Sequence, residues 1–193
     1  DSDKAKEEIK RWVMATFWGG KLHIGKETLD VQNAIVVLPP RIKYCELFAD
    51  AVNELAREKH LAIKCVKASA KKDTTDESYI SDNAKRFQEW NRECKADKST
   101  IHLLATFNKG LQSVSFPDCH AVIMISDMVS PEAYIQAAFR SKTPNDVKRV
   151  AYVIDYNKGR TLHMIDTFIK NHLFVQACDS NYKNEYNRAL STI

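Results

Sequence analysis

The sequence has little glycine and proline, five of each in 193 residues, which is too few for a chain of β-hairpins or a long flexible linker. It has no apolar run near the ~20 residues that a transmembrane helix needs. Its first twelve residues, DSDKAKEEIKRW, mix acidic and basic side chains, unlike a secretory signal or a transit peptide. These absences argue against a membrane protein and a secreted protein, and we expect a cytoplasmic chain.

Cysteine and histidine are present without the spacing of a metal or disulfide site. The five cysteines are odd in number and form no CxxC pair, and the six histidines show no pattern such as HExxH. We therefore expect no metal site and no disulfide framework, and we expect most thiols to be small buried hydrophobes in a reducing compartment. The cysteines are Cys45, Cys65, Cys94, Cys119 and Cys178.

The overall composition is that of an ordinary globular domain, with 44% hydrophobic and 28% charged residues. A prior of ~150 residues per domain predicts one domain with a possible appendage. The formal net charge of +4 is compatible with a polyanionic partner. A charge of this size is common, so it does not select one class of partner.

Apolar runs alternate with helix-period segments along most of the chain. Continuous runs such as AIVVL at 34–38 are typical of strands buried on both faces, and parallel strands need helical crossovers. The pattern predicts an α/β fold, with an open, mostly parallel sheet and helices on both faces. We expect strands at 34–38, 61–66, 101–105, 121–126 and 149–155, and helices at 43–58, 79–92, 131–140 and 159–170.

The two ends of the chain are polar and weakly patterned. We expect a peripheral helix and loop over 1–32, the α/β domain over 33–175 and a tail over 176–193. No second domain is called for by the composition.

The segment GKLHIGK at 20–26 has the glycine and lysine spacing of a phosphate-binding P-loop. That loop needs a strand before it, a helix after it, and a Ser or Thr beside the lysine for magnesium. Here Glu27 takes the place of that hydroxyl, and a strand is expected to follow. We interpret the segment as a surface loop.

A polar loop follows the buried strand at 101–105. It contains Thr106, Asn108, Lys109 and Gly110, and the carboxyl edge of a parallel sheet is where α/β folds bind ligands. Hydroxyl, amide and ammonium donors there suit phosphate oxygens. An ordinary polar connection explains the same residues equally well.

The helix predicted at 131–140 begins with Ser130 as N-cap and Pro131 at the first helical position. Gln136 and Arg140 are four residues apart and so share a face. An arginine at a helix end also complements the helix dipole, which is a purely structural explanation for Arg140.

Taken together and in order, these segments resemble the second RecA-like domain of superfamily-two helicases and translocases, especially restriction-enzyme and phage-type members. Motif IV of that family resembles residues 35–55, motif V resembles Thr106 through Pro117, and motif VI resembles Gln136 through Arg140. The resemblance covers about 33–172 and lies in the order and spacing of the motifs.

The resemblance implies that ATP is bound between this domain and a first RecA-like domain of the same polypeptide, which holds Mg²⁺. Arg140 would then be the catalytic arginine that stabilises charge during phosphoryl transfer. Gln136, Gly110 and Gln112 would lie on the ATP side of the domain. The chain alone has no convincing P-loop and is expected not to hydrolyse ATP.

The same resemblance implies contacts with nucleic acid through Thr106, Asn108 and Lys109. We expect DNA, and the sequence leaves RNA open as the alternative. Such contacts to the backbone position a strand without reading its sequence. No membrane partner is expected.

Two departures from the family pattern leave alternatives open. Phe139 stands where motif VI has a glycine, and Thr143 where it has a second arginine. These changes favour a second hypothesis, a non-catalytic helicase-like docking module in a nuclease complex. A third hypothesis, a free-standing α/β enzyme, lacks the glycine-rich turn after the first strand, where Pro39, Pro40 and Arg41 stand instead.

Overall fold

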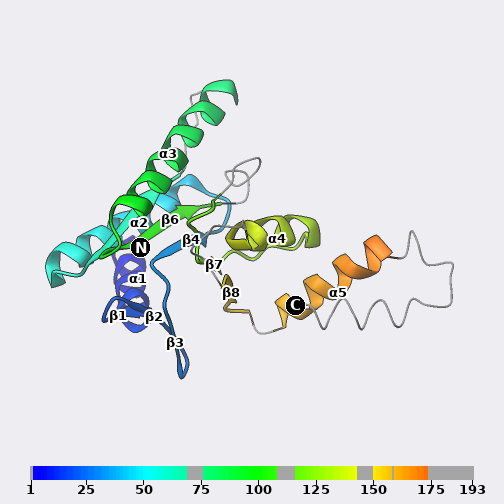
Figure 1. Ribbon diagram of the computed structural model, residues 1–193, viewed down its shortest axis with the longest axis horizontal. Helices are drawn as coiled ribbons and strands as arrows, with labels where there is room; N and C mark the ends of the chain where they lie inside the picture. The colour runs from blue at the N-terminus through cyan, green and yellow to red at the C-terminus, as the bar shows by residue number, and fades with distance from the viewer. Residues whose placement is uncertain (1, 69–75, 108–115, 143–149, 158, 174–193) are drawn as a thin grey trace.

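The computed structural model describes residues 2–68, 76–107, 116–142, 150–157 and 159–173. The central element is a five-stranded sheet in the order β5-β6-β4-β7-β8, with helices on both sides (Figure 1). All four neighbouring strand pairs of this sheet are parallel. The predicted fold class, an open parallel α/β sheet, is therefore confirmed. The strands are β4 (Asn33–Val37), β5 (Ile63–Lys67), β6 (Ile101–Thr106), β7 (Ala121–Met124) and β8 (Tyr152–Asp155).

Alternate side chains of the central strand enter two separate hydrophobic cores. In β4, Ala34 and Val36 face one core and Ile35 and Val37 the other, all fully buried. This burial on both faces explains why the strand is a continuous apolar run without polar alternation.

The helices divide between the two faces of the sheet. Residues of α2 (Ile42–Lys59) belong to the first core, and residues of α3 (Asp76–Ala96), α4 (Pro131–Ala138) and α5 (Arg160–Leu173) to the second. A short 3₁₀ helix, η2 (Phe139–Lys142), continues α4. Among the described residues, no helix combines the length and apolar character needed to cross a bilayer.

The first thirty residues differ from the peripheral helix and loop that the sequence predicts. The helix exists as α1 (Ser2–Thr16), but a three-stranded antiparallel sheet follows it. Its strands are only two to four residues long, too short for a detectable alternation: β1 (Phe17–Trp18), β2 (Lys21–Ile24) and β3 (Glu27–Leu29).

This N-terminal segment is part of the first core. Val13, Phe17 and Leu22 are fully buried in it. The segment therefore adds a layer over α2. Its polar sequence did not predict this packing.

The glycine-lysine segment at 20–26 forms part of this small sheet. Ile24 pairs with Glu27, so Gly25 and Lys26 are the two loop residues of a hairpin. Gly25 has φ +60°, which the tight turns that join antiparallel strands require at this position. Strand pairing on both sides of Gly25 is incompatible with a P-loop, as the sequence indicates.

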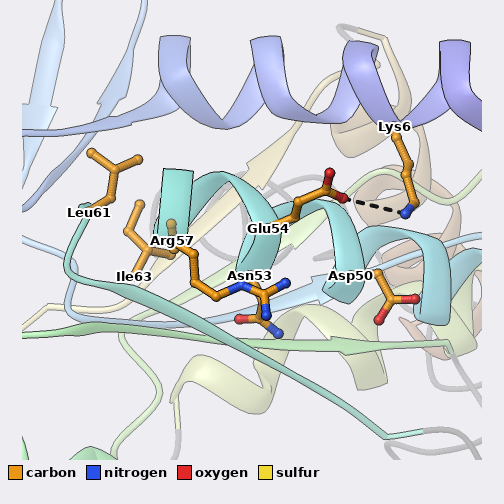
Figure 2. A pocket seen from close by; sticks show the side chains of 8 residues that line it. Lys6, Asp50, Asn53, Glu54, Arg57, Leu61 and Ile63 are labelled. Carbon is orange, nitrogen blue, oxygen red and sulfur yellow. Dashed lines mark hydrogen bonds and ion pairs between the residues drawn. The ribbon is translucent and has the colours of Figure 1, made fainter. Parts of the chain in front are cut away.

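Ion pairs attach α1 to α2 on the outer surface of the molecule. The Lys10 Nζ lies 3.1 Å from Glu54 Oε1 and 3.0 Å from Glu58 Oε1. Lys6 reaches Glu54 at 3.4 Å, as Figure 2 shows. The hydrogen bonds that Lys10 donates to Glu58 and Glu54 hold the pKa of Lys10 above its usual range.

The edge strand β5 is covered by a side chain of α2. Asn53 donates Nδ2 to the carbonyl of Cys65 at 2.8 Å and accepts from its backbone N–H at 2.9 Å. The amide thus satisfies backbone groups that an edge strand would otherwise leave open to pairing with another chain.

Replacing Lys10 tests whether α1 is held by these charges. We expect Lys10→Met to lower the midpoint of thermal unfolding at low salt, because Glu54 and Glu58 lose their shared cation. The difference from wild type should shrink in about 1 M NaCl, because the carboxylates of Glu54 and Glu58 are 37% and 46% exposed and salt screens them.

The matched control is Arg11→Met, since Arg11 is an exposed cation next along the same helix. An equal loss of stability in both variants, or a loss insensitive to salt, would argue against the ion-pair account.

Candidate functional site

Thr106 ends β6 at the carboxyl edge of the sheet, where the polar loop is expected. Its side chain is fully buried. The hydroxyl lies 3.3 Å from the carbonyl oxygens of Ala68 and Phe107. The residue thus closes the end of the strand and fixes where the next segment starts, and its hydroxyl faces the protein interior.

Four of the residues singled out by sequence lie outside the described residues. They are Asn108, Lys109, Gly110 and Gln112. Their predicted roles stay predictions. Thr143, one of the departures from motif VI, also lies outside the described residues.

The start of α4 agrees with the sequence prediction. Ser130 is the N-cap, and its hydroxyl accepts a hydrogen bond from the Ala133 N–H at 3.3 Å. The α-helical part ends at Ala138, two residues before Arg140, and the tighter η2 turn contains Arg140 itself. The sequence therefore places the end of the α-helix about half a turn too far toward the C-terminus.

Hydrogen bonds at both ends fix α4 against β8. At its beginning, the Tyr134 hydroxyl donates to Asp155 Oδ2 at 3.1 Å, at the last residue of β8. Just beyond its end, the buried Ser141 hydroxyl lies 3.2 Å from the carbonyl of Ala138 and 3.3 Å from the carbonyl of Tyr152, the first residue of β8. The helix thus runs antiparallel to the strand.

This anchoring determines where Gln136 and Arg140 lie. Gln136 is exposed on the outer side of α4, while its neighbours Ile135 and Ala137 are buried. Arg140 is half-buried, next to the Ser141 anchor, and burial lowers the pKa of its guanidinium. The group stays charged at neutral pH, because the guanidinium of arginine is not deprotonated in proteins.

The site residues therefore fall into two groups. Thr106 is at the carboxyl edge of the sheet, whereas Arg140 lies near the amino end of β8, across the length of α4. A ligand that contacts Gln136 and Arg140 approaches the outer side of the helix layer.

A buried ion pair beside α4 was missed by sequence reasoning. Arg160, the first residue of α5, donates Nε to Asp155 Oδ2 at 2.9 Å and Nη2 to Oδ1 at 2.7 Å. The two side chains are only 7% and 2% exposed. Such fork-shaped pairs are among the strongest hydrogen-bonded contacts in proteins.

Side chains and backbone from several elements make hydrogen bonds to the same pair. The Arg160 Nη1 also donates to the carbonyl of Ser126, after β7. Tyr134 and Thr161 add their hydroxyls to Asp155. The signal in the sequence was an acidic residue at a strand end with an arginine five residues on.

The charges of this pair stabilise each other. Burial by itself would raise the pKa of Asp155, but the hydrogen bonds from Arg160 and Asn157 and the Arg160 charge outweigh it and lower the pKa. The hydrogen bond to Asp155 in turn raises the pKa of Arg160. Asp155 is therefore ionised in the folded protein at neutral pH.

Thiol and metal chemistry have no support in the described part of the chain. Its four cysteines are buried and free, and burial raises the pKa of Cys45 to about 12, so its nucleophilic thiolate is scarce. Within the same residues, no group of three or more His, Cys, Asp or Glu side chains could hold a metal ion.

Comparisons with solved structures identify proteins of similar architecture. No protein-family model and no curated protein sequence matches the chain. Among solved structures, it is similar to the ATP-dependent Type ISP restriction-modification enzyme LlaBIII bound to DNA, with 14% identity and a TM-score of 0.54 over 95% of this chain.

Two DEAD-box proteins match with lower scores. One is domain 2 of a DEAD-box helicase bound to an RNA duplex, at 18% identity and a TM-score of 0.42 over 97% of this chain. The other is a DEAD box protein from the hyperthermophile Methanococcus jannaschii, at 14% identity and a TM-score of 0.41 over 88%. The chain spans 11% of the LlaBIII chain and 64% and 38% of the other two.

The sheet order and the match to the restriction-modification enzyme together define the fold. The chain has a RecA-like α/β fold. A likeness at 14% identity defines the architecture alone.

Removing one partner of the buried pair should strongly destabilise the folded protein. We expect Asp155→Ala to lower the free energy of unfolding by about 3–5 kcal/mol, because it leaves the Arg160 charge buried without its counter-ion. Denaturant unfolding of the purified chain measures the change.

Asp127→Ala is the matched control. Asp127 lies 3.7 Å from the Arg160 Nη1 but is 98% exposed, so its loss should cost no more than about 1 kcal/mol. Similar costs in the two variants would show that the buried pair does not dominate this region.

The lowered pKa of Asp155 predicts acid sensitivity. Because the folded pKa lies below the unfolded value of about 3.9, its stabilisation is fully present above that pH and is lost as pH falls through the folded pKa. The stability gap between wild type and Asp155→Asn should be constant near neutral pH and should narrow below about pH 4. A gap that widens in acid would contradict this assignment.

Proposed function

We propose that the chain is the second motor domain of an ATP-dependent DNA helicase or translocase, within a restriction-modification or phage-related protein. The observation that carries the proposal is Arg140, held on a turn that is fixed against β8, on a sheet of RecA-like order. An arginine placed in this way can act on a nucleotide that another domain brings to it.

The chemistry assigned to Arg140 is electrostatic. In ATP hydrolysis, water attacks the γ-phosphorus and the bond to the β,γ-bridging oxygen breaks, with Mg²⁺ held by the first RecA-like domain. Arg140 stabilises the negative charge on the transferring phosphoryl group. The Ser141 anchor positions it, since an arginine that must first be ordered contributes less.

We assign Gln136 to a contact with the edge of the same nucleotide. Because Gln136 is exposed on α4, its amide is available to a ligand that is bound to another domain. Gly110 and Gln112 are assigned to this nucleotide side because of the motif V resemblance.

We place the nucleic acid at the carboxyl edge of the sheet. Thr106 fixes the start of the loop there, and Asn108 and Lys109 supply the donors to backbone phosphates. DNA is preferred over RNA because one similar structure, with a TM-score of 0.54, is that of a DNA-bound enzyme.

A non-catalytic docking module is the second candidate. Phe139, 41% exposed beside Arg140, favours it because a large apolar group there suits a protein contact. The two candidates differ in whether Arg140 affects the rate of ATP hydrolysis.

The decisive variant is Arg140→Ala, in the protein that joins this domain to a first RecA-like domain. We expect DNA-stimulated ATPase activity to fall about 10³-fold or more, the typical contribution of such an arginine. Thermal unfolding of the variant checks that it folds as wild type, so that a loss of activity is not taken for a loss of structure.

Arg92→Ala is the matched control, since Arg92 is an arginine on α3 with a 78% exposed side chain. It should retain full activity. Activity indifferent to Arg140 supports the docking module, and ATP turnover by the 193-residue chain alone would refute the two-domain account.

A further inference from the structure

A pocket of about 700 Å³ opens at the carboxyl edge of the sheet, apart from Gln136 and Arg140. It lies between α1, the beginning of α2 and the segments that follow β4, β7 and β8. The functional assignment above leaves this pocket without a role.

The pocket lies at the switch point of the sheet. After β4 the chain moves to the β5 and β6 side, and after β7 it moves to β8 on the other side. Open parallel sheets bind ligands in the crevice outside the carboxyl ends of two such strands. Its volume is within the ~300–1,000 Å³ of small-molecule sites.

Aromatic rings from three different elements line the pocket: Trp12, Tyr44 and Tyr156. Trp12 is fixed by ring contacts with Phe48 and Tyr156, at centroid distances of 5.8 and 5.9 Å. Tyr44 and Tyr156 keep 39% and 49% of their surface exposed. Two exposed rings beside a fixed indole suit a flat ligand that stacks.

The polar groups of the pocket indicate which kind of flat ligand fits it. Glu8 and Asp127 contribute exposed carboxylates, which accept hydrogen bonds from amino groups and repel an anion. Arg41 supplies a cation, with its guanidinium 5.8 Å from the centre of the Tyr44 ring. A nucleotide matches this set, because its base is flat and carries amino donors while its phosphate is anionic.

We propose that this pocket binds an unpaired base of a single-stranded nucleic acid, stacked on Tyr44 and Tyr156 with Arg41 beside its phosphate. The inference rests on the proposed function, which brings a nucleic acid to this edge of the sheet. It adds a base-dependent contact to the backbone contacts of the loop after Thr106. Stacking of this kind tolerates any base because every base has a π-face.

The test compares two single-stranded oligomers of about 12 nucleotides, one of deoxyadenylate and one abasic, with equal numbers of phosphates. Binding to the full 193-residue chain is measured by fluorescence anisotropy. We expect the adenylate oligomer to bind more tightly, and Tyr156→Ala and Tyr44→Ala each to weaken it about tenfold without affecting the abasic oligomer.

Two controls accompany these variants. Tyr156→Phe keeps the ring and should bind as wild type. Trp18→Ala removes an aromatic side chain that is 56% exposed but outside the pocket, and it should also bind as wild type.

Three results would overturn the proposal that this pocket binds a base. Wild type could bind both oligomers equally, it could bind neither, or its preference for the adenylate oligomer could survive Tyr156→Ala and Tyr44→Ala. Each of these leaves the Arg140 ATPase prediction standing, so the two proposals fail separately. Full displacement of the oligomer by adenosine monophosphate at equal concentration would assign the pocket to a free nucleotide and overturn the assignment to a strand.

Discussion

The buried pair of Asp155 and Arg160 is the interaction on which the position of α4 depends. It joins the end of β8 to the start of α5, and through Ser126 and Tyr134 it also holds the segment after β7 and the start of α4. A charge pair that is less than a tenth exposed is costly to bury. The many hydrogen bonds to its two members offset that cost, and they fix the orientation of α4, which determines where Arg140 lies.

The domain divides its two proposed tasks between opposite ends of α4. Near the amino end of β8, Ser141 fixes the turn that contains Arg140. At the carboxyl edge, Thr106 ends β6 and the aromatic pocket opens outside the strands. Both ends are tied to β8, so a rigid-body movement of this domain moves the arginine and the nucleic-acid contacts together. Coupling of ATP hydrolysis to movement along a strand requires such a shared rigid element.

The sequence predicted the main sheet well because each buried strand is a continuous apolar run between helices of clear period. It did not predict the small sheet of β1, β2 and β3, whose strands are too short to show alternation. Nor did it predict the burial of the Thr106 hydroxyl or the Asp155–Arg160 pair, because both depend on which residues distant in sequence meet. Local patterns determine the elements, and the side-chain environment of the candidate site follows from their packing.

The most direct test of the central claim is a structure of this domain joined to a first RecA-like domain, with DNA and a transition-state analogue of ATP. The measured quantity is the distance from the Arg140 guanidinium to the oxygens that mimic the γ-phosphoryl group. The account predicts direct hydrogen bonds of about 2.7–3.2 Å. A closed complex in which Arg140 stays packed beside Ser141, out of reach of the analogue, would contradict the motor assignment.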